Sequence, residues 1–388
     1  MSFSLFEVWD GMRKRFLLFV AICVAVLAGG LRGALAADLV VVDTPQGKRQ
    51  VMCNILEETY RYIKVKSQDE TRTIYTDPKY ADSASAKKII VVDVKHGQFP
   101  PKFAQANIDR RNRQYAAAFE GFKEAASEVT GNRQWLAPYL WYYAGETAFN
   151  EAKYGQVDPK SKQQWYKEAA DKFGKLVGAI ENHYFVPDAR LGLARTQIRL
   201  DEFTRARQTL QAIENSDYPD DVRMAARVWN GRLLVEEGRF EDAIEKLQAL
   251  AEEFMGNQPR LAYLAKLSEA YAWQGKENFA RAEDLFQKVG LRSPEMEMRA
   301  EAFNSRGLSL KKRGQQREAL FSFLRVIVLH HSIRNEYQKA LYHGAITSKE
   351  YYSNAPRRAR ELGMRLAHKF PNSYWAKRLK TEHPDLTG

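Results

Sequence analysis

An alanine followed four residues later by a large apolar residue recurs six times, and this pattern constrains the fold more than any other feature of the chain. The pairs are Ala118 and Phe122, Ala169 and Phe173, Ala206 and Leu210, Ala243 and Leu247, Ala282 and Phe286, and Ala319 and Phe323. Successive alanines are 51, 37, 37, 39 and 37 residues apart. Residues four apart share one face of an α-helix, and a fixed period of roughly 20 to 50 residues is typical of stacked repeats. The pattern therefore predicts a helical array.

Each repeat also carries the marks of two helices joined by a turn. A small residue precedes the alanine by twelve positions in three units, at Ala194, Gly231 and Gly307. Small residues at fixed points allow two helices to approach closely. Gly238 and Gly314 stand where the turn between the two helices is expected. The long first step of 51 residues has a local cause, because a polar loop over 154–162, with Gly155 and Pro159, lengthens that unit.

This arrangement resembles the tetratricopeptide repeat family over residues 102–379. Trp141 and Gly145 match the first helix of the second unit, and Leu264, Leu267, Tyr271 and Gly275 match that of the fifth. The units are longer than usual for the family, and Arg190 and Arg227 replace its first large apolar residue. The closing segment 370–376 is similar to the unit junction of envelope members of the family, and Ser373 to Leu379 is expected to be a C-terminal cap. The resemblance implies a superhelix that binds a protein or peptide in its concave groove.

Residues 38–94 have a period of two and are rich in strand formers. Five short strands are expected over 39–42, 50–56, 60–65, 71–75 and 89–94, separated by turns such as Thr44-Pro45-Gln46-Gly47. Such strands suit a small SH3-like barrel. Two roles stay open for this module: a ligand or partner module, or a cover for the open end of the array. Pro100 and Pro101 then exclude both a continuing strand and a helix interior.

The predicted fold is therefore mainly α, with six to seven helix pairs in a tetratricopeptide-like solenoid preceded by a small all-β module. Thirteen Pro and 23 Gly in 388 residues agree with long elements and few loops. The expected domains are a signal peptide over 1–36, the β module over 37–95, a linker over 96–101, the solenoid over 102–380 and a polar tail over 381–388.

The N-terminus has the three-part layout of a secretory signal. A basic start over 12–15 precedes an apolar run over 16–27, and Ala34-Leu35-Ala36 provides small residues before a cut at Ala37. We expect export to the periplasm or cell envelope of a bacterium, with an uncleaved anchor as the alternative and Met12 as a second candidate start. Cys53 would be alone in the mature chain, so an intramolecular disulfide is not expected.

The sequence offers no catalytic constellation and no cofactor motif, which favours a non-enzymatic protein. The seven histidines are scattered, and the one adjacent pair, His330 and His331, would point about 100° apart on a helix, so no metal site is expected. No Gly-rich phosphate loop or nucleophile elbow occurs. Cys53 in a strand is interpreted as a small core residue.

The charge balance limits the partner without naming it. Sixty Lys and Arg against 48 Asp and Glu give a net charge of +12. Export argues against nucleic acid, and a protein or peptide with acidic groups is the expected partner. The alternative is an envelope structural or assembly factor that self-associates or lies on anionic lipid or wall polymer. An enzyme subunit that lends substrate binding to a partner is a third hypothesis. The oligomeric state is left open.

Four groove residues are predicted to contact the partner. In this repeat family the residue after the small one of the first helix projects into the groove, which gives Arg195 and Arg232, with Asn304 and Lys311 on the equivalent face of a later unit. Two stacked guanidinium groups can grip a carboxylate. The competing interpretation is that the arginines pair with local acids such as Glu236 or Glu269.

Overall fold

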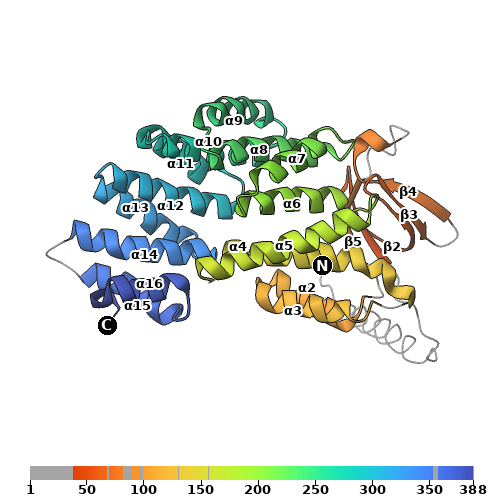
Figure 1. The fold of residues 1–388 in the computed structure, drawn as a ribbon, viewed down its shortest axis with the longest axis horizontal. Helices are drawn as coiled ribbons and strands as arrows, with labels where there is room; N and C mark the ends of the chain where they lie inside the picture. The colour runs from red at the N-terminus through yellow and green to blue at the C-terminus, as the bar shows by residue number, and fades with distance from the viewer. Residues whose placement is uncertain are drawn as a thin grey trace, which may run out of the picture.

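The computed structural model describes residues 38–67, 70–81, 90–95, 99–129, 131–155, 157–352 and 357–387. The predicted signal lies outside these residues. Figure 1 shows a small strand module followed by helices that curve into one array. No helix among the described residues is long and apolar enough to cross a membrane.

Five strands close into a barrel in the order β1 to β5. They are β1 (Asp38–Thr44), β2 (Gly47–Glu58), β3 (Tyr62–Ser67), β4 (Glu70–Tyr75) and β5 (Ile90–Lys95), with a short 3-10 helix η1 (Pro78–Tyr80) after β4. Neighbouring strands are antiparallel, except for the parallel pairing of β4 with β5 that completes the ring. Alternate residues such as Val40, Ile63 and Val65 fill the barrel, and Cys53 is buried among them. The predicted SH3-like module and the core role of Cys53 are thus seen in the structure.

Seven helix pairs follow, and we number them as units 1 to 7. They are α2 (Pro101–Arg111) with α3 (Tyr115–Ala126), α4 (Ala137–Tyr154) with α5 (Pro159–Ala179), α6 (Val186–Arg199) with α7 (Phe203–Glu214), α8 (Asp220–Glu236) with α9 (Phe240–Phe254), α10 (Pro259–Gly275) with α11 (Phe279–Arg292), α12 (Met296–Lys312) with α13 (Gln316–Leu329), and α14 (Arg334–Tyr351) with α15 (Arg357–Lys369). A 3-10 turn, η3 (Gly131–Leu136), precedes α4. The final helix is α16 (Tyr374–Glu382).

The predicted repeat register is confirmed. All six alanines of the pattern lie in the second helix of a unit with no exposed surface, and so does Ala359 in α15. The large apolar residue four positions later is also buried in all six units of the pattern, whereas Gly363 occupies this position in α15. The small residue twelve positions earlier permits this packing, since a Cβ on Gly231 would lie 2.5 Å from a methyl carbon of Leu247. Close helix contact within each unit therefore depends on small residues on one helix and a bulky one on the other.

Five of the turns inside units contain one residue with left-handed backbone. These residues are Arg113, Asp201, Gly238, Glu277 and Gly314, with φ between 58° and 76°. In each turn the next residue donates its N–H to the carbonyl oxygen five residues earlier, at 2.8–3.0 Å. This hydrogen bond satisfies a carbonyl at the end of the first helix. The two turn glycines noted in the sequence therefore mark a position that other residues occupy at a conformational cost.

The two arginines that depart from the family pattern cover aromatic rings. The guanidinium of Arg190 lies 5.5 Å from the ring centre of Tyr218, and that of Arg227 lies 5.3 Å from that of Phe254. Arg227 also forms two hydrogen bonds of 2.6 and 2.7 Å with Glu253. The stems of these arginines can cover apolar surface while their heads stay charged.

The barrel is attached to the side of units 2 to 4. Glu58 accepts a 2.5 Å hydrogen bond from the Tyr139 hydroxyl of α4, and Asp217 in the turn before α8 accepts one of 2.7 Å from Tyr60. Asp77 accepts another, of 3.0 Å, from the first backbone N–H of α8. Of the two roles left open for the module, a cover for the open end of the array does not match these contacts, which lie on units 2 to 4. The acidic turn before α8 and the start of α4 hold the barrel along the edge of the array (Figure 1).

The C-terminus is more structured than expected. Ser373 accepts a 3.1 Å hydrogen bond from the Ala376 N–H and caps α16, as the prediction of a terminal helix requires. However, α16 runs to Glu382, and a 3-10 turn, η4 (Pro384–Leu386), buries Leu386 against α15. The predicted polar tail over 381–388 is thus corrected, because one apolar residue among polar ones is enough to dock it.

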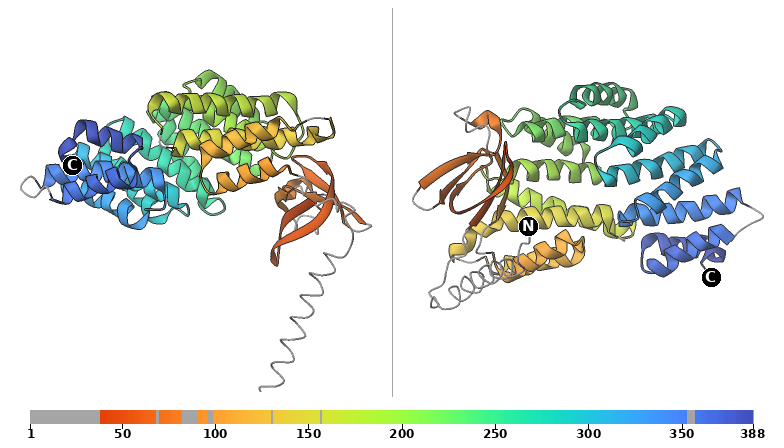
Figure 2. Two further views of the ribbon diagram at one scale, coloured as in Figure 1. Left: turned by 90° about the horizontal axis from the view of Figure 1, so that it is seen from below. Right: turned by 180° about the vertical axis from the view of Figure 1, so that it is seen from behind.

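The array curves until unit 2 meets unit 7. Asn335 at the start of α14 donates a 3.3 Å hydrogen bond to the carbonyl oxygen of Lys153 in α4. Arg113, in the turn of unit 1, pairs with Glu297 of α12 at 2.7 Å. The C-terminal helices therefore return to the first units of the array (Figures 1 and 2).

Candidate functional site

A cavity of about 520 Å³ lies where the array closes on itself. It is lined by the first helices of units 2 to 7, by the N-terminal part of α5 and by α16. The lining residues are Ala152, Lys153, Gly155, Val157, Pro159, Lys162, Tyr166, Arg199, Arg232, Tyr271, Glu301, Asn335, Glu336, Gln338, Lys339, Tyr374 and Trp375. This volume is within the range of small-molecule sites and would also admit a short peptide segment.

The 51-residue step of the repeat builds one wall of this cavity. The loop between α4 and α5 contributes Gly155 and Val157, and α5 begins with Pro159 after the cap residue Asp158, which accepts hydrogen bonds from two backbone N–H groups. With 21 residues, α5 is longer than any other helix in the described part of the chain. Its first turns carry Lys162 and Tyr166 to the cavity.

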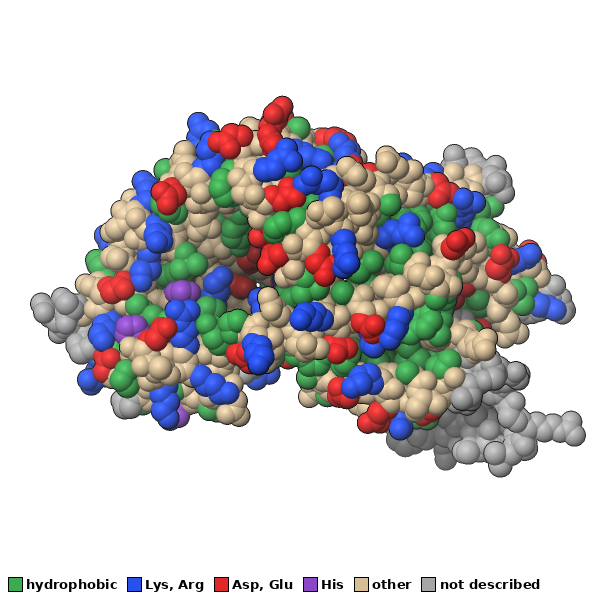
Figure 3. All heavy atoms as spheres, in the orientation of Figure 1, with side chains coloured by type: hydrophobic (Ala, Val, Ile, Leu, Met, Phe, Trp, Pro, Cys, Tyr) green, Lys and Arg blue, Asp and Glu red, His purple; other side chains and the backbone are tan. Residues whose placement is uncertain are grey.

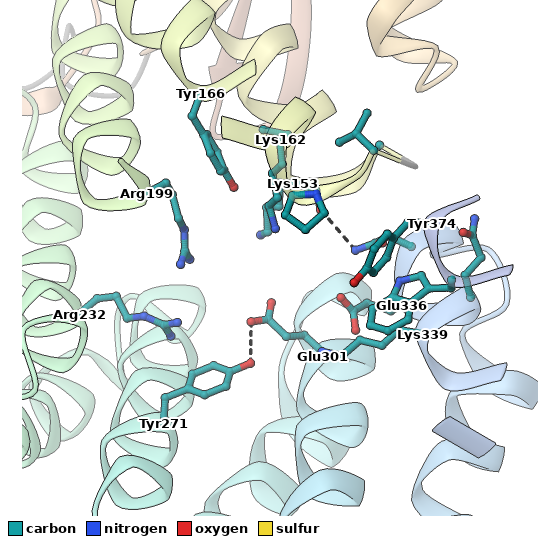
Figure 4. A pocket seen from close by; sticks show the side chains of 17 residues that line it. Lys153, Lys162, Tyr166, Arg199, Arg232, Tyr271, Glu301, Glu336, Lys339 and Tyr374 are labelled. Carbon is teal, nitrogen blue, oxygen red and sulfur yellow. Dashed lines mark hydrogen bonds between the residues drawn. The ribbon is translucent and has the colours of Figure 1, made fainter. Parts of the chain in front are cut away.

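The charges around the cavity are unbalanced. Five lining side chains are cationic and two, Glu301 and Glu336, are acidic. In contrast, basic and acidic side chains are interspersed on the outer surface seen in Figure 3. Figure 4 shows Glu301 and Glu336 in the middle of the group, with Lys153 and Lys162 on one side and Arg199 and Arg232 on another. The cavity lining thus has a larger proportion of cationic side chains than the chain as a whole.

Glu301 is held as a carboxylate. Burial disfavours its charge, but Lys153, Arg232 and a 2.9 Å hydrogen bond from the Tyr271 hydroxyl lower its pKa below the usual value. Burial likewise opposes the charge of Lys153, yet Tyr154 and Glu301 raise the pKa of its ammonium. Both groups are therefore charged at neutral pH, and Glu301 offsets part of the local positive charge.

The other cations are less well neutralised. Arg199 and Arg232 donate to the same oxygen of Glu236, at 3.2 and 3.0 Å. Desolvation within the concave face, and then the like charges of Arg199 and Lys339, lower the pKa of Lys162. Among the described residues, no carboxylate lies within ion-pairing distance of the Lys162 and Lys339 ammonium groups. The cavity can therefore accept additional negative charge.

Comparison with known proteins agrees with this fold. A tetratricopeptide repeat family model matches residues 188–221, which cover most of α6, all of α7 and the start of α8. This segment of the chain is therefore similar to a tetratricopeptide repeat. No curated protein sequence matches it significantly.

Three of the solved structures that resemble this chain share low sequence identity with it. A tetratricopeptide repeat protein from Parabacteroides merdae is 15% identical, with 74% of this chain and 97% of that chain covered and a TM-score of 0.44. PilW, described as a widely conserved type IV pilus biogenesis factor, is 15% identical, with 61% and 97% covered and a TM-score of 0.42. The C-terminal part of a repeat protein from Cytophaga hutchinsonii is 17% identical, with 71% and 98% covered and a TM-score of 0.34.

Of the four predicted groove residues, only Arg232 lines the cavity. Its guanidinium lies 4.4 Å from the ring centre of Tyr271 and donates to Glu236, one of the local acids considered from the sequence. The other such acid, Glu269, accepts a hydrogen bond from Trp273. Arg195 lies 4.5 and 5.0 Å from the ring centres of Phe149 and Trp229, and its buried Nε has no hydrogen-bond partner among the described residues.

Asn304 and Lys311 are placed differently from the prediction. Asn304 has no exposed surface, and its amide donates to the backbone oxygen and the carboxylate of Glu336, at 2.9 and 2.7 Å. The Asn304 amide therefore orients the Glu336 carboxylate of the cavity and is not exposed to a partner. Lys311 is paired with Glu350 at 2.9 Å, outside the cavity lining. Counting along the repeat placed these residues on the correct helix but did not give their depth.

The cavity lining contains no histidine or cysteine. In the described part of the chain, no group of three or more His, Cys, Asp or Glu is suited to hold a metal. Sequence reasoning missed Lys153, Lys162, Arg199 and Lys339. For Lys162, the outlying 51-residue step was the available signal, since it marks the insertion that carries this residue, and Lys153 directly precedes that insertion.

Proposed function

We propose that the protein is an exported, non-enzymatic scaffold that holds a protein or peptide partner against the concave face of its superhelix. One observation carries this proposal: the first helices of six consecutive units converge on a single charged cavity. Tetratricopeptide arrays are protein-interaction scaffolds, and stacked repeats create concave binding surfaces of this kind. Export rests on the signal-like N-terminus, and the basic lining favours a partner with acidic groups.

Position-dependent crosslinking tests the scaffold. A photoreactive residue in place of Lys339 should capture one partner protein in stoichiometric amount in the cells that produce the chain. The same residue in place of Arg205, which is 72% exposed on the second helix α7, should not capture that partner. Capture of only lipid or wall material at both positions would favour the alternative, an envelope structural factor acting through its basic surface.

A double variant then tests the predicted groove arginines. Arg195→Ala with Arg232→Ala should weaken binding of the captured partner by at least about tenfold, and salt should weaken the wild-type complex. Arg205→Ala with Arg317→Ala, on second helices, removes the same charge elsewhere and serves as the control. Because both groove arginines lie over aromatic rings, thermal unfolding must be measured in parallel. Equal partner affinity in the double variant and the wild type would refute the groove assignment.

A further inference from the structure

The closure of the superhelix brings like charges together from distant parts of the chain. Lys153 and Lys162 belong to unit 2 and Arg199 to unit 3, whereas Lys339 belongs to unit 7. All four line the same cavity (Figure 4). Arg199 and Lys339 are also the two charges that act most strongly on Lys162. Electrostatic repulsion across the seam between units 2 and 7 therefore opposes closure.

The polar contacts described across the array are weak by comparison. The hydrogen bond from Asn335 to the Lys153 carbonyl is long, at 3.3 Å, and the Arg113 to Glu297 pair has side chains that are 50% and 37% exposed. Exposed ion pairs contribute little to stability because water and salt screen them. Glu301 and Glu336 supply two negative charges to the lining, and Glu236 supplies a third that Arg199 and Arg232 share. Five cationic side chains therefore face three carboxylates, and the seam carries an excess of positive charge.

We propose that the cavity binds a small multivalent oxyanion, carrying phosphate or carboxylate groups, which joins unit 2 to unit 7 across the seam. Arginine guanidinium groups offer paired donors to such oxygens, and lysine ammonium groups act as point charges. The Tyr166 hydroxyl points toward the same space and adds a neutral donor (Figure 4). The cavity of about 520 Å³ accommodates an ion of the size of pyrophosphate or citrate. This site does not depend on the identity of the protein partner.

Calorimetric titration tests the site directly. Pyrophosphate, orthophosphate and citrate are titrated into the mature chain at constant ionic strength, with chloride as the balancing ion. We expect one-to-one binding that Lys162→Ala with Lys339→Ala weakens by at least about tenfold, since two charge-assisted contacts are lost. Lys167→Ala with Lys312→Ala removes two exposed lysines outside the cavity and should change the affinity by less than about twofold.

The choice of ions separates the two sources of the anion. Tighter binding of pyrophosphate assigns the site to a phosphate compound, and tighter binding of citrate assigns it to a polycarboxylate. Absence of binding by all three ions would overturn the proposal. Equal weakening in the cavity and control variants would also overturn it, because the effect would then reflect net charge alone.

Distance measurement tests the bridging role. Spin labels are attached at Gln163→Cys of α5 and Lys377→Cys of α16, two exposed positions outside the cavity lining. The bound anion should shorten and narrow the distribution of distances between the labels, and Lys162→Ala with Lys339→Ala should abolish this change. An unchanged distribution at saturating anion would overturn the bridging role.

Discussion

The change in the free energy of unfolding caused by Gly192→Ala tests how closely the helices of neighbouring units pack. Gly192 in α6 and Gly145 in α4 both abut the Phe173 ring, which is only 3% exposed. A Cβ on Gly192 would lie 2.7 Å from one ring carbon and 2.8 Å from another. Alanine is favoured over glycine in a helix by about 1 kcal/mol, but overpacking of an enclosed core costs about 1–3 kcal/mol. The difference between these terms is a net loss of roughly 0–2 kcal/mol, so Gly192→Ala should lower the free energy of unfolding by up to about 2 kcal/mol.

Gly174 in α5 provides the matched control, because a Cβ there would meet no atom within 4 Å. Gly174→Ala should therefore raise the free energy of unfolding by about 0.5–1 kcal/mol. The measurement is urea unfolding followed by circular dichroism, with hydrogen exchange in α4 to α6 to detect unfolding of part of the array. Phe173→Leu should reduce the penalty of Gly192→Ala by removing the ring. If Gly192→Ala stabilises the protein as much as Gly174→Ala does, the packing argument is refuted.

Four further predictions follow from the described residues and the N-terminal sequence. Ala243→Leu should destabilise by roughly 1–3 kcal/mol in urea unfolding, because Ala243 has no exposed surface; a change near zero would contradict the repeat register. Glu277→Gly should stabilise by about 0.5–1 kcal/mol in the same assay by relieving a φ of 58°. Burial, and then the charge of Lys339, lower the pKa of His343 to about 3. The unfolded chain therefore binds the proton first, and stability should fall between pH 6.5 and about 3, by at most about 1.4 kcal/mol per pH unit. His343→Phe should reduce this loss when thermal unfolding is compared at pH 7 and pH 4.5. Mass spectrometry of the secreted chain should find a start near Ala37 without lipid, and an intact apolar N-terminus would contradict export with cleavage.

The repeat could be predicted because its signal is local. An alanine and a large residue four positions apart report one helix face, and the 37-residue spacing carries that face from unit to unit. The structure places every one of those alanines at a buried contact. The role of the barrel could not be predicted in this way. Its position depends on hydrogen bonds that Asp217 and Glu58 form with residues more than 80 positions away in the sequence. Such contacts produce no periodic pattern in the sequence.

The groove residues show the same limit at the level of single side chains. Counting from Ala194 and Gly231 identified two arginines on first helices, but Arg195 is held between aromatic rings and Arg232 reaches the cavity. The difference depends on which aromatic residues surround each position. Asn304 is buried because Glu336 of the next unit packs against it. Counting positions within one unit gives no information about this contact between units.

The insertion between α4 and α5 links the irregularity of the sequence to the site. In a strictly periodic array, every internal unit has the same neighbours. A site that occurs at one unit only therefore requires a residue or segment that departs from the repeat. Here the break lengthens α5 at its N-terminus, and Lys162 at that end lines the cavity together with residues of α14 and α16. The insertion therefore supplies one wall of the cavity and one of its five cations, whereas Arg199, Arg232 and Lys339 come from the first helices of other units. The cavity thus depends both on the repeat, which stacks those helices, and on the single departure from it.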